Sequence, residues 1–125
     1  MILLYNTAMA YKILIIDDEP HIVMIVKARL ENAGYEVISA GDGREGLDKA
    51  RTEKPDLILL DLMLPLISGD EICRTLKADP EYKKIPIIIF TARARQTDDC
   101  ADDIVNKPFD PKQLLDKIAA LLRKK

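Results

Sequence analysis

Three uninterrupted apolar runs constrain the fold of this chain more than any other feature. They cover residues 13–16, 57–60 and 85–90, and they consist of Ile, Leu and Phe with one proline. A strand with one buried face alternates apolar and polar residues, whereas a strand buried on both faces is apolar throughout. The runs therefore predict central strands of a parallel sheet that is covered on both sides.

The remaining segments predict the covering helices and two further strands. Residues 35–40 and 104–105 are weaker strand candidates, and we expect the first of them at an edge. Apolar residues at helical spacing follow the first run, recur around Leu47 and Ile72, and are most regular in residues 114–122. This alternation predicts an α/β fold in which a doubly wound, five-stranded parallel sheet forms the middle of three layers.

Composition limits the organisation of the chain and the class of its partners. With 125 residues the chain has room for one domain, which we place at residues 9–125, after an N-terminal extension of residues 1–8. Nineteen basic and 21 acidic residues give a net charge of -2, which argues against nucleic acid as a main partner. We find no membrane-spanning run and no signal peptide, so we expect a cytoplasmic protein without membrane contact.

The two cysteines fit that expectation. Cys73 falls beside the inward side of a predicted helix and is interpreted as a small core residue, while Cys100 lies in a polar stretch. Two cysteines do not make a disulfide framework, and a reducing compartment is the default for such a chain.

Polar residues follow the predicted strands at the points where these end. Asp17 and Asp18 follow the first strand, Asp61 the third, Thr91 the fourth, and Lys107 the fifth. Ligands of open α/β sheets bind beyond the carboxyl ends of the strands, so we expect these side chains to share one crevice. Singly, each could be a helix cap or a turn residue, but five at one end of a sheet indicate a site.

The residue types indicate phosphoryl chemistry with a metal ion. Neighbouring carboxylates repel one another unless a cation lies between them, and oxygen ligands favour Mg²⁺. A lysine and a threonine hydroxyl can bind phosphoryl oxygens while a carboxylate acts as the nucleophile.

Four motifs resemble the signatures of two-component response-regulator receiver domains. They are Ile-Ile-Asp-Asp-Glu-Pro at residues 15–20, Leu-Leu-Asp-Leu-Met-Leu-Pro at 59–65, Phe-Thr-Ala at 90–92 and Asn-Lys-Pro-Phe at 106–109. The resemblance spans residues 10–125. It implies a flavodoxin-like strand order of 2-1-3-4-5 and a cis peptide bond between Lys107 and the proline after it.

The resemblance also implies a role for each site residue. Asp61 would accept a phosphoryl group from a histidine kinase or a phosphotransfer protein, and Thr91 and Lys107 would bind the phosphoryl oxygens. The Mg²⁺ ligands would be Asp18, Asp61 and the backbone carbonyl of Met63, and Asp17 would act through metal-bound water.

Two features depart from the family pattern. Residues 92–103 lack the apolar stripe of the usual fourth helix, so we expect a loop or a single helical turn there. Ile104 stands where relatives usually have an aromatic ring that changes rotamer on phosphorylation. Loss of the helix would leave an apolar flank at Ile87 and Ile89 beside Ile104, which we expect to bind a protein partner.

The favoured function is a phosphoacceptor signalling module whose phosphorylation changes the binding of a protein effector. Such a module is not an enzyme in the ordinary sense, because it catalyses only its own phosphorylation and dephosphorylation. A degenerate receiver used as a protein-binding scaffold is the alternative. A Mg²⁺-dependent hydrolase would need a second aspartate where Met63 stands, and a flavin carrier would be repelled by Asp17 and Asp18.

Overall fold

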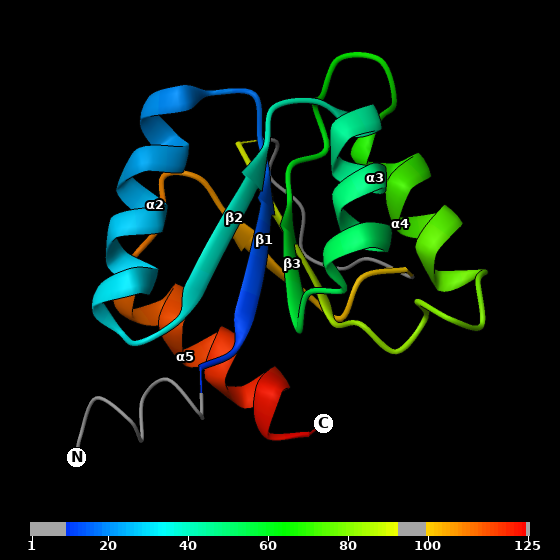
Figure 1. The fold of residues 1–125 in the computed structure, drawn as a ribbon. Helices are drawn as coiled ribbons and strands as arrows, with labels where there is room; N and C mark the ends of the chain where they lie inside the picture. Colours follow the sequence, from blue (N-terminus) through cyan, green and yellow to red (C-terminus); the bar gives the residue numbers. More distant parts are fainter. Residues whose placement is uncertain (1–9, 93–99, 125) are drawn as a thin grey trace.

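A computed structural model describes residues 10–92 and 100–124, which form nine elements (Figure 1). In chain order they are β1 (Lys12–Ile16), α2 (Pro20–Asn32), β2 (Glu36–Ala40), α3 (Gly43–Glu53), β3 (Leu57–Leu60), α4 (Gly69–Lys77), β4 (Ile87–Thr91), β5 (Asp103–Asn106) and α5 (Pro111–Arg123). Strands and helices alternate from β1 to β4 as the sequence predicts, and α5 follows β5.

The five strands form one sheet in the order β2-β1-β3-β4-β5, and every neighbouring pair is parallel. This confirms the expected fold class, its strand order and the edge position of β2. The three apolar runs form β1, β3 and β4, which are the three inner strands. All residues of β3 and β4 are buried, as two-sided coverage of these strands requires.

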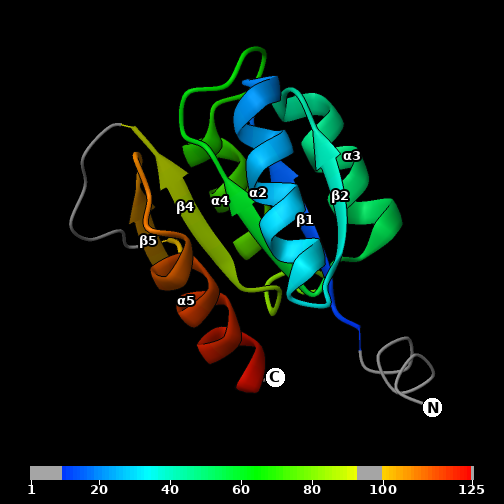
Figure 2. The same cartoon turned by 90° about the vertical axis from the view of Figure 1, so that its left-hand side faces the viewer.

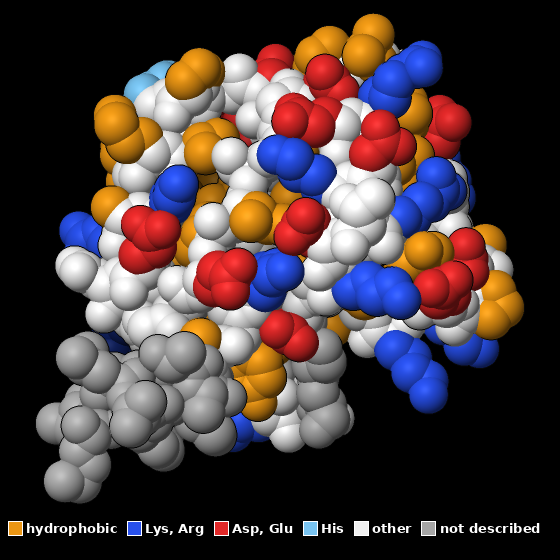
Figure 3. Space-filling view, in the orientation of Figure 1, with side chains coloured by type: hydrophobic (Ala, Val, Ile, Leu, Met, Phe, Trp, Pro, Cys, Tyr) orange, Lys and Arg blue, Asp and Glu red, His pale blue; other side chains and the backbone are white. Residues whose placement is uncertain are grey.

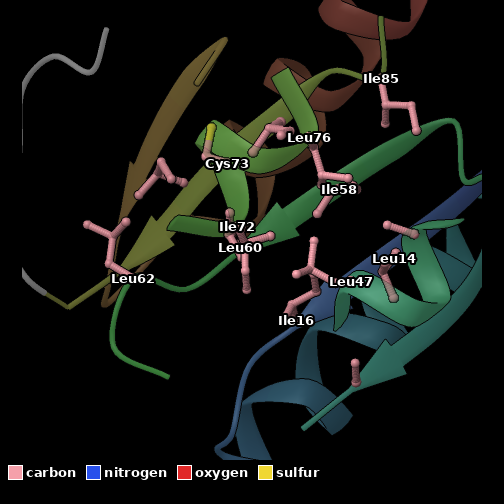
Figure 4. Packing of buried hydrophobic residues seen from close by; sticks show 14 residues of the cluster. Leu14, Ile16, Leu47, Ile58, Leu60, Leu62, Ile72, Cys73, Leu76 and Ile85 are labelled. Atoms are coloured by element: carbon pink, nitrogen blue, oxygen red, sulfur yellow. The ribbon is translucent and has the colours of Figure 1, made fainter. Parts of the chain in front are cut away.

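Helices cover both faces of the sheet, with α2 and α5 on one side and α3 and α4 on the other (Figures 1 and 2). Side chains of β1 alternate between the two layers. Leu14 and Ile16 pack towards α3 and α4, and Ile13 and Ile15 pack towards α2 and α5. Figure 4 shows the core cluster that contains Leu14 and Ile16, in which side chains of β1 and β3 meet those of α3 and α4.

Local sequence signals fix where the helices begin. The carboxylates of Asp42 and Asp110 and the hydroxyl of Ser68 accept backbone N–H groups in the first turns of α3, α5 and α4. Pro20 and Pro111 occupy first-turn positions, where the missing N–H costs no hydrogen bond. The turn after α2 uses Gly34 at φ 99°, a left-handed conformation that glycine adopts without strain.

The connection between β4 and β5 was expected to be a loop or a single helical turn. Residues 93–99 lie outside the described part of the chain, as does the N-terminal extension of residues 1–8. The described residues 100–102 contain no helix and lead directly into β5.

The expected apolar flank beside β4 is not exposed. Ile87 and Ile89 have no accessible surface, and Ile104 is partly buried against the same cluster as Cys100 and Ala101. The prediction assumed that losing a helix would uncover the strand. Instead, the chain ahead of β5 packs over it, so this flank is not an apolar docking surface.

Asp102 holds that segment in place. Its backbone N–H donates to the carbonyl of Ile87 at 2.8 Å, and its Oδ2 accepts the N–H of Ile87 at 2.8 Å. The same Oδ2 lies 2.9 Å from the Nζ of Lys77 on α4. The segment is therefore bound both to the start of β4 and to the end of α4.

The cysteines also differ from the sequence prediction. Cys73 is buried in the core, as expected, but its sulfur is bonded to that of Cys100, and the two Cα atoms are 6.3 Å apart. Their separation of 27 residues gave no indication that the fold would bring them together.

Among the described residues, no helix combines the length and the apolar character needed to cross a membrane.

A close approach at the start of α4 yields a stability prediction. A Cβ added at Gly69 would lie 2.2 Å from the carbonyl oxygen of Asp61 and 2.7 Å from the Cα of Leu62. Because both obstacles are backbone atoms, we expect Gly69→Ala to lower the free energy of unfolding by about 2 kcal/mol. Urea denaturation measures this change, with Gly41→Ala as the control because its added Cβ meets one side-chain atom at 4.0 Å. Equal stability of the two variants would contradict the proposed crowding.

Candidate functional site

The sheet places two aspartates side by side at its carboxyl edge. Asp17 follows β1 and Asp61 follows β3, and the two strands are neighbours. The N–H of Asp17 donates to the carbonyl of Ala40 at 3.0 Å, and that of Asp61 donates to Ile16 at 3.0 Å. These bonds extend the strand ladders by one residue. They fix both backbones, and both aspartates are buried at 2% and 5% exposure.

Lys107 joins the carboxylates from the far side of β4. Its Nζ lies 2.6 Å from Oδ2 of Asp17, 3.1 Å from Oε1 of Glu19 and 3.5 Å from Oδ2 of Asp61. The side chains of Lys107, Asp17 and Asp61 are at most 8% exposed, so the two ion pairs with the aspartates are largely shielded from water, whereas Glu19 is 47% exposed. The structure thus brings Lys107 together with two of the three predicted aspartates.

A backbone hydrogen bond holds Lys107 at the site. Its N–H donates to the carbonyl of Thr91 at 2.7 Å, which ties the residue after β5 to the end of β4. The peptide bond to Pro108 is cis, as the resemblance implied. The ammonium also lies 5.0 Å from the ring centroid of Phe90, within the range of a cation–π contact.

Burial shifts the acid–base properties of this pair. Burial raises the pKa of Asp17 above its ordinary 3.8, outweighing the hydrogen bonds from Lys107 and from the N–H of Glu19, and the charge of Asp61 adds to the rise. Burial alone would lower the pKa of Lys107. Its hydrogen bonds to Asp17 and Glu19 and the attraction of the aspartates outweigh burial, so this pKa lies above 10.5. The site therefore favours a retained positive charge among the carboxylates.

Three carboxylates are arranged so that they could hold a metal ion. One oxygen each from Asp17, Glu19 and Asp61 lies within 4.8 Å of the others, a group found among the described residues. All donors are carboxylate oxygens, so the set fits a hard cation such as Mg²⁺. Glu19 was not predicted as a site residue. Its signal in the sequence was its place in the acidic run Asp-Asp-Glu before α2.

Asp18 and Met63 are placed differently from that cluster. Asp18 is exposed and lines a hollow together with Asp17 and Gly41, and it is not one of the three gathered carboxylates. The N–H of Met63 donates to Oδ1 of Asp61 at 3.3 Å, and its side chain is 63% exposed. The metal contacts expected of Asp18 and of the Met63 carbonyl remain predictions.

Thr91 ends β4 with no accessible surface. Its strand lies between β3 and β5, so it comes from the element that separates Asp61 from Lys107. Its contact with phosphoryl oxygens remains a prediction. At position 104, the partly buried isoleucine packs into the cluster beneath α3 and α4.

The sequence of the chain matches a family model and the sequences of curated proteins. The sequence model of the response regulator receiver domain family matches residues 13–119. The alkaline phosphatase synthesis transcriptional regulatory protein PhoP of Bacillus subtilis (strain 168) is 44% identical over 119 residues, which are 90% of this chain and 49% of PhoP. The chain thus spans about half the length of the curated relatives it matches.

Solved structures agree with that match. A CheY-like response regulator receiver domain from Methanospirillum hungatei superposes with a TM-score of 0.85 at 32% identity, covering 92% of this chain and 95% of the other. The receiver domain of a sensor histidine kinase from Pseudomonas aeruginosa gives 0.83 at 29% identity over 90% and 98% of the chains, and its structure has magnesium in the active-site cleft. On this sequence match and this fold, the chain belongs to the response regulator receiver domain family.

Proposed function

We propose that this receiver domain is a phosphoacceptor module in which Asp61 takes a phosphoryl group from a histidine kinase or a phosphotransfer protein. The observation that carries the proposal is the buried ammonium of Lys107, within 3.5 Å of Asp61 and 2.6 Å of Asp17. A lysine so placed can meet the negative charge of a phosphoryl group that arrives at the Asp61 carboxylate.

The chemistry follows from the placement of the side chains. A carboxylate oxygen of Asp61 forms a bond to phosphorus while the bond to the donor's leaving atom breaks, and the donor keeps that electron pair. Lys107 then shares its hydrogen bonds between Asp17 and the new phosphoryl oxygens. Thr91, at the end of the intervening strand, supplies a hydroxyl to the same oxygens. The domain acts on itself, so it is a signalling module and not an enzyme acting on a separate substrate.

The carboxylates supply the metal site of this proposal. Asp18, which is exposed, would hold Mg²⁺ together with Asp61 and the backbone carbonyl of Met63, and Asp17 would act through metal-bound water. When bound, the ion stabilises the charge that develops on the transferred group. Glu19 is a further candidate ligand, because one of its carboxylate oxygens lies within 4.8 Å of a carboxylate oxygen of each of the two aspartates.

The partners follow from the same proposal. They are the phosphoryl donor and a protein effector whose binding changes after phosphorylation, in the cytoplasm and without membrane contact. We do not propose nucleic acid as a partner of this domain. Its net charge is -2, and acidic and basic side chains are mixed over the face shown in Figure 3. The transcriptional role in the name of PhoP belongs to a protein about twice as long.

Phosphorylation of Asp61 is the first test. We expect incubation with acetyl phosphate and Mg²⁺ to raise the intact mass by one phosphoryl group, and Asp61→Asn to abolish the gain because the nucleophile is lost. Asp48→Asn, on the exposed side of α3, is the matched control and should behave as the wild type. Phosphoryl uptake that persists in Asp61→Asn would refute the assignment. No uptake by a folded wild type would favour the scaffold function.

The metal ligands are tested by comparing two neighbouring acids. We expect Asp18→Ala to remove the Mg²⁺ dependence of phosphorylation by deleting a direct ligand, while Glu19→Gln keeps that dependence and weakens apparent Mg²⁺ affinity by about tenfold. Initial rates across a Mg²⁺ titration distinguish the variants. If Glu19→Gln shows the large loss and Asp18→Ala does not, the carboxylates gathered in the structure are the ligands and the assignment of Asp18 is wrong.

Removing the lysine should expose the repulsion between the carboxylates. We expect Lys107→Met to lower the free energy of unfolding by about 3 kcal/mol without Mg²⁺, because Asp17 and Asp61 lose their buried counter-charge. Added Mg²⁺ should restore part of that loss by binding the folded state. Urea denaturation with and without Mg²⁺ measures both effects. Lys112→Met, at a side chain that is 84% exposed, serves as control. A loss that Mg²⁺ leaves unchanged would contradict the role of charge.

A further inference from the structure

The bond between Cys73 and Cys100 joins helix α4 to the chain ahead of β5. Cys73 lies one turn inside α4, and Cys100 lies three residues ahead of β5. Their Cα atoms are 6.3 Å apart, which is within the range of roughly 4.4–6.8 Å that disulfides span. The backbone therefore holds the two cysteines at bonding distance.

The two sulfurs differ in access. Cys73 is 1% exposed within the cluster beneath α3 and α4, whereas Cys100 is partly buried at the rim of that cluster. A thiol or disulfide reagent from solution therefore reaches Cys100 first. Cys73 is positioned to complete or to release the bond, because it faces Cys100 from the covered side.

Non-covalent contacts keep the pair together when the bond is open. Lys77, one helical turn after Cys73, binds Oδ2 of Asp102 at 2.9 Å. Asp102 also exchanges hydrogen bonds of 2.8 Å with Ile87 at the start of β4. Because these contacts do not involve the sulfurs, we expect the reduced thiols to stay adjacent, so that the bond can form again without refolding.

Both cysteines lie in segments that follow site residues. The N–H of Gly69, at the start of α4, donates to the carbonyl of Leu62 at 3.1 Å. Leu62 is the residue directly after Asp61. Cys100 belongs to the connection that runs from Thr91 to β5. Oxidation therefore ties the segment after Asp61 to the segment after Thr91.

We infer that Cys73 and Cys100 form a reversible thiol–disulfide modification site that takes a low-molecular-weight disulfide as oxidant and fixes the chain ahead of β5 to α4. The thiolate of Cys100 attacks the reagent disulfide and releases one reagent thiolate. The thiolate of Cys73 then attacks the Cys100 sulfur and releases the second. The two reagent thiolates take up the two protons lost by the cysteines, so the reagent is reduced by two electrons and the protein is oxidised by two.

The test compares the oxidised and reduced forms of the whole folded chain. Samples equilibrated with oxidised or reduced glutathione are alkylated, weighed intact and digested to locate the Cys73–Cys100 peptide. Thermal unfolding and hydrogen exchange of peptides covering α4 and residues 100–106 are then measured. We expect the oxidised form to melt roughly 10 °C higher, and residues 100–102 to exchange on the order of tenfold more slowly.

Cys100→Ser is the matched control, since it removes the accessible sulfur and leaves the buried one in place. We expect its melting temperature and exchange to be the same in both glutathione buffers. The inference is overturned if the folded wild type gives no linked peptide after oxidation, or if its two forms melt and exchange alike. It is also overturned if reduced glutathione fails to open the bond in the folded protein. None of these readouts requires that Asp61 be phosphorylated.

Discussion

The ion pairs of Lys107 are the interaction on which the functional part of this structure depends. Asp17 and Asp61 are buried side by side at 2% and 5% exposure, and the Lys107 ammonium, 2.6 Å and 3.5 Å from them, supplies a compensating charge. The raised pKa of Asp17 shows that burial still disfavours its charge. A site in which one cation only partly offsets several carboxylates is one that gains from a second cation, which is the physical basis for expecting Mg²⁺.

The sheet makes this charge cluster possible. The site residues come from loops after β1, β3 and β5, and each is held by a backbone hydrogen bond that extends a strand pairing: Asp17 to Ala40, Asp61 to Ile16, and Lys107 to Thr91. Strand order therefore decides which side chains meet. The inner strands stabilise that order, because β3 and β4 are completely buried, β1 is buried except at Lys12, and each presents apolar side chains to helices on both faces.

Features set by residues close together in the sequence could be predicted, whereas features set by contacts between distant residues could not. The apolar runs and the polar residues after them are local signals, and they were enough to predict the sheet and to place Asp17, Asp61, Thr91 and Lys107 at its carboxyl edge. The approach of Glu19 depends on how the chain turns before α2. Ile87 is joined through its backbone to Asp102, fifteen residues away, and it is buried in a cluster that includes residues of α4. The cysteine pairing depends on packing between α4 and the chain ahead of β5. The apolar runs and the polar residues after them carry no information about that packing.

The departure from the family pattern between β4 and β5 need not disturb the site. Lys107 is positioned through β5, and β5 pairs with β4 along Asp103–Asn106, with Asn106 opposite Thr91. The pairing and the bond from Lys107 to Thr91 are made by residues 88–91 and 103–107. On the opposite side of that pairing, Asp102 and the cysteine bond attach the end of the connection to α4. Among the described residues, the sheet therefore holds Lys107 on one side of this pairing, and Asp102 and the cysteine bond hold residues 100–102 on the other.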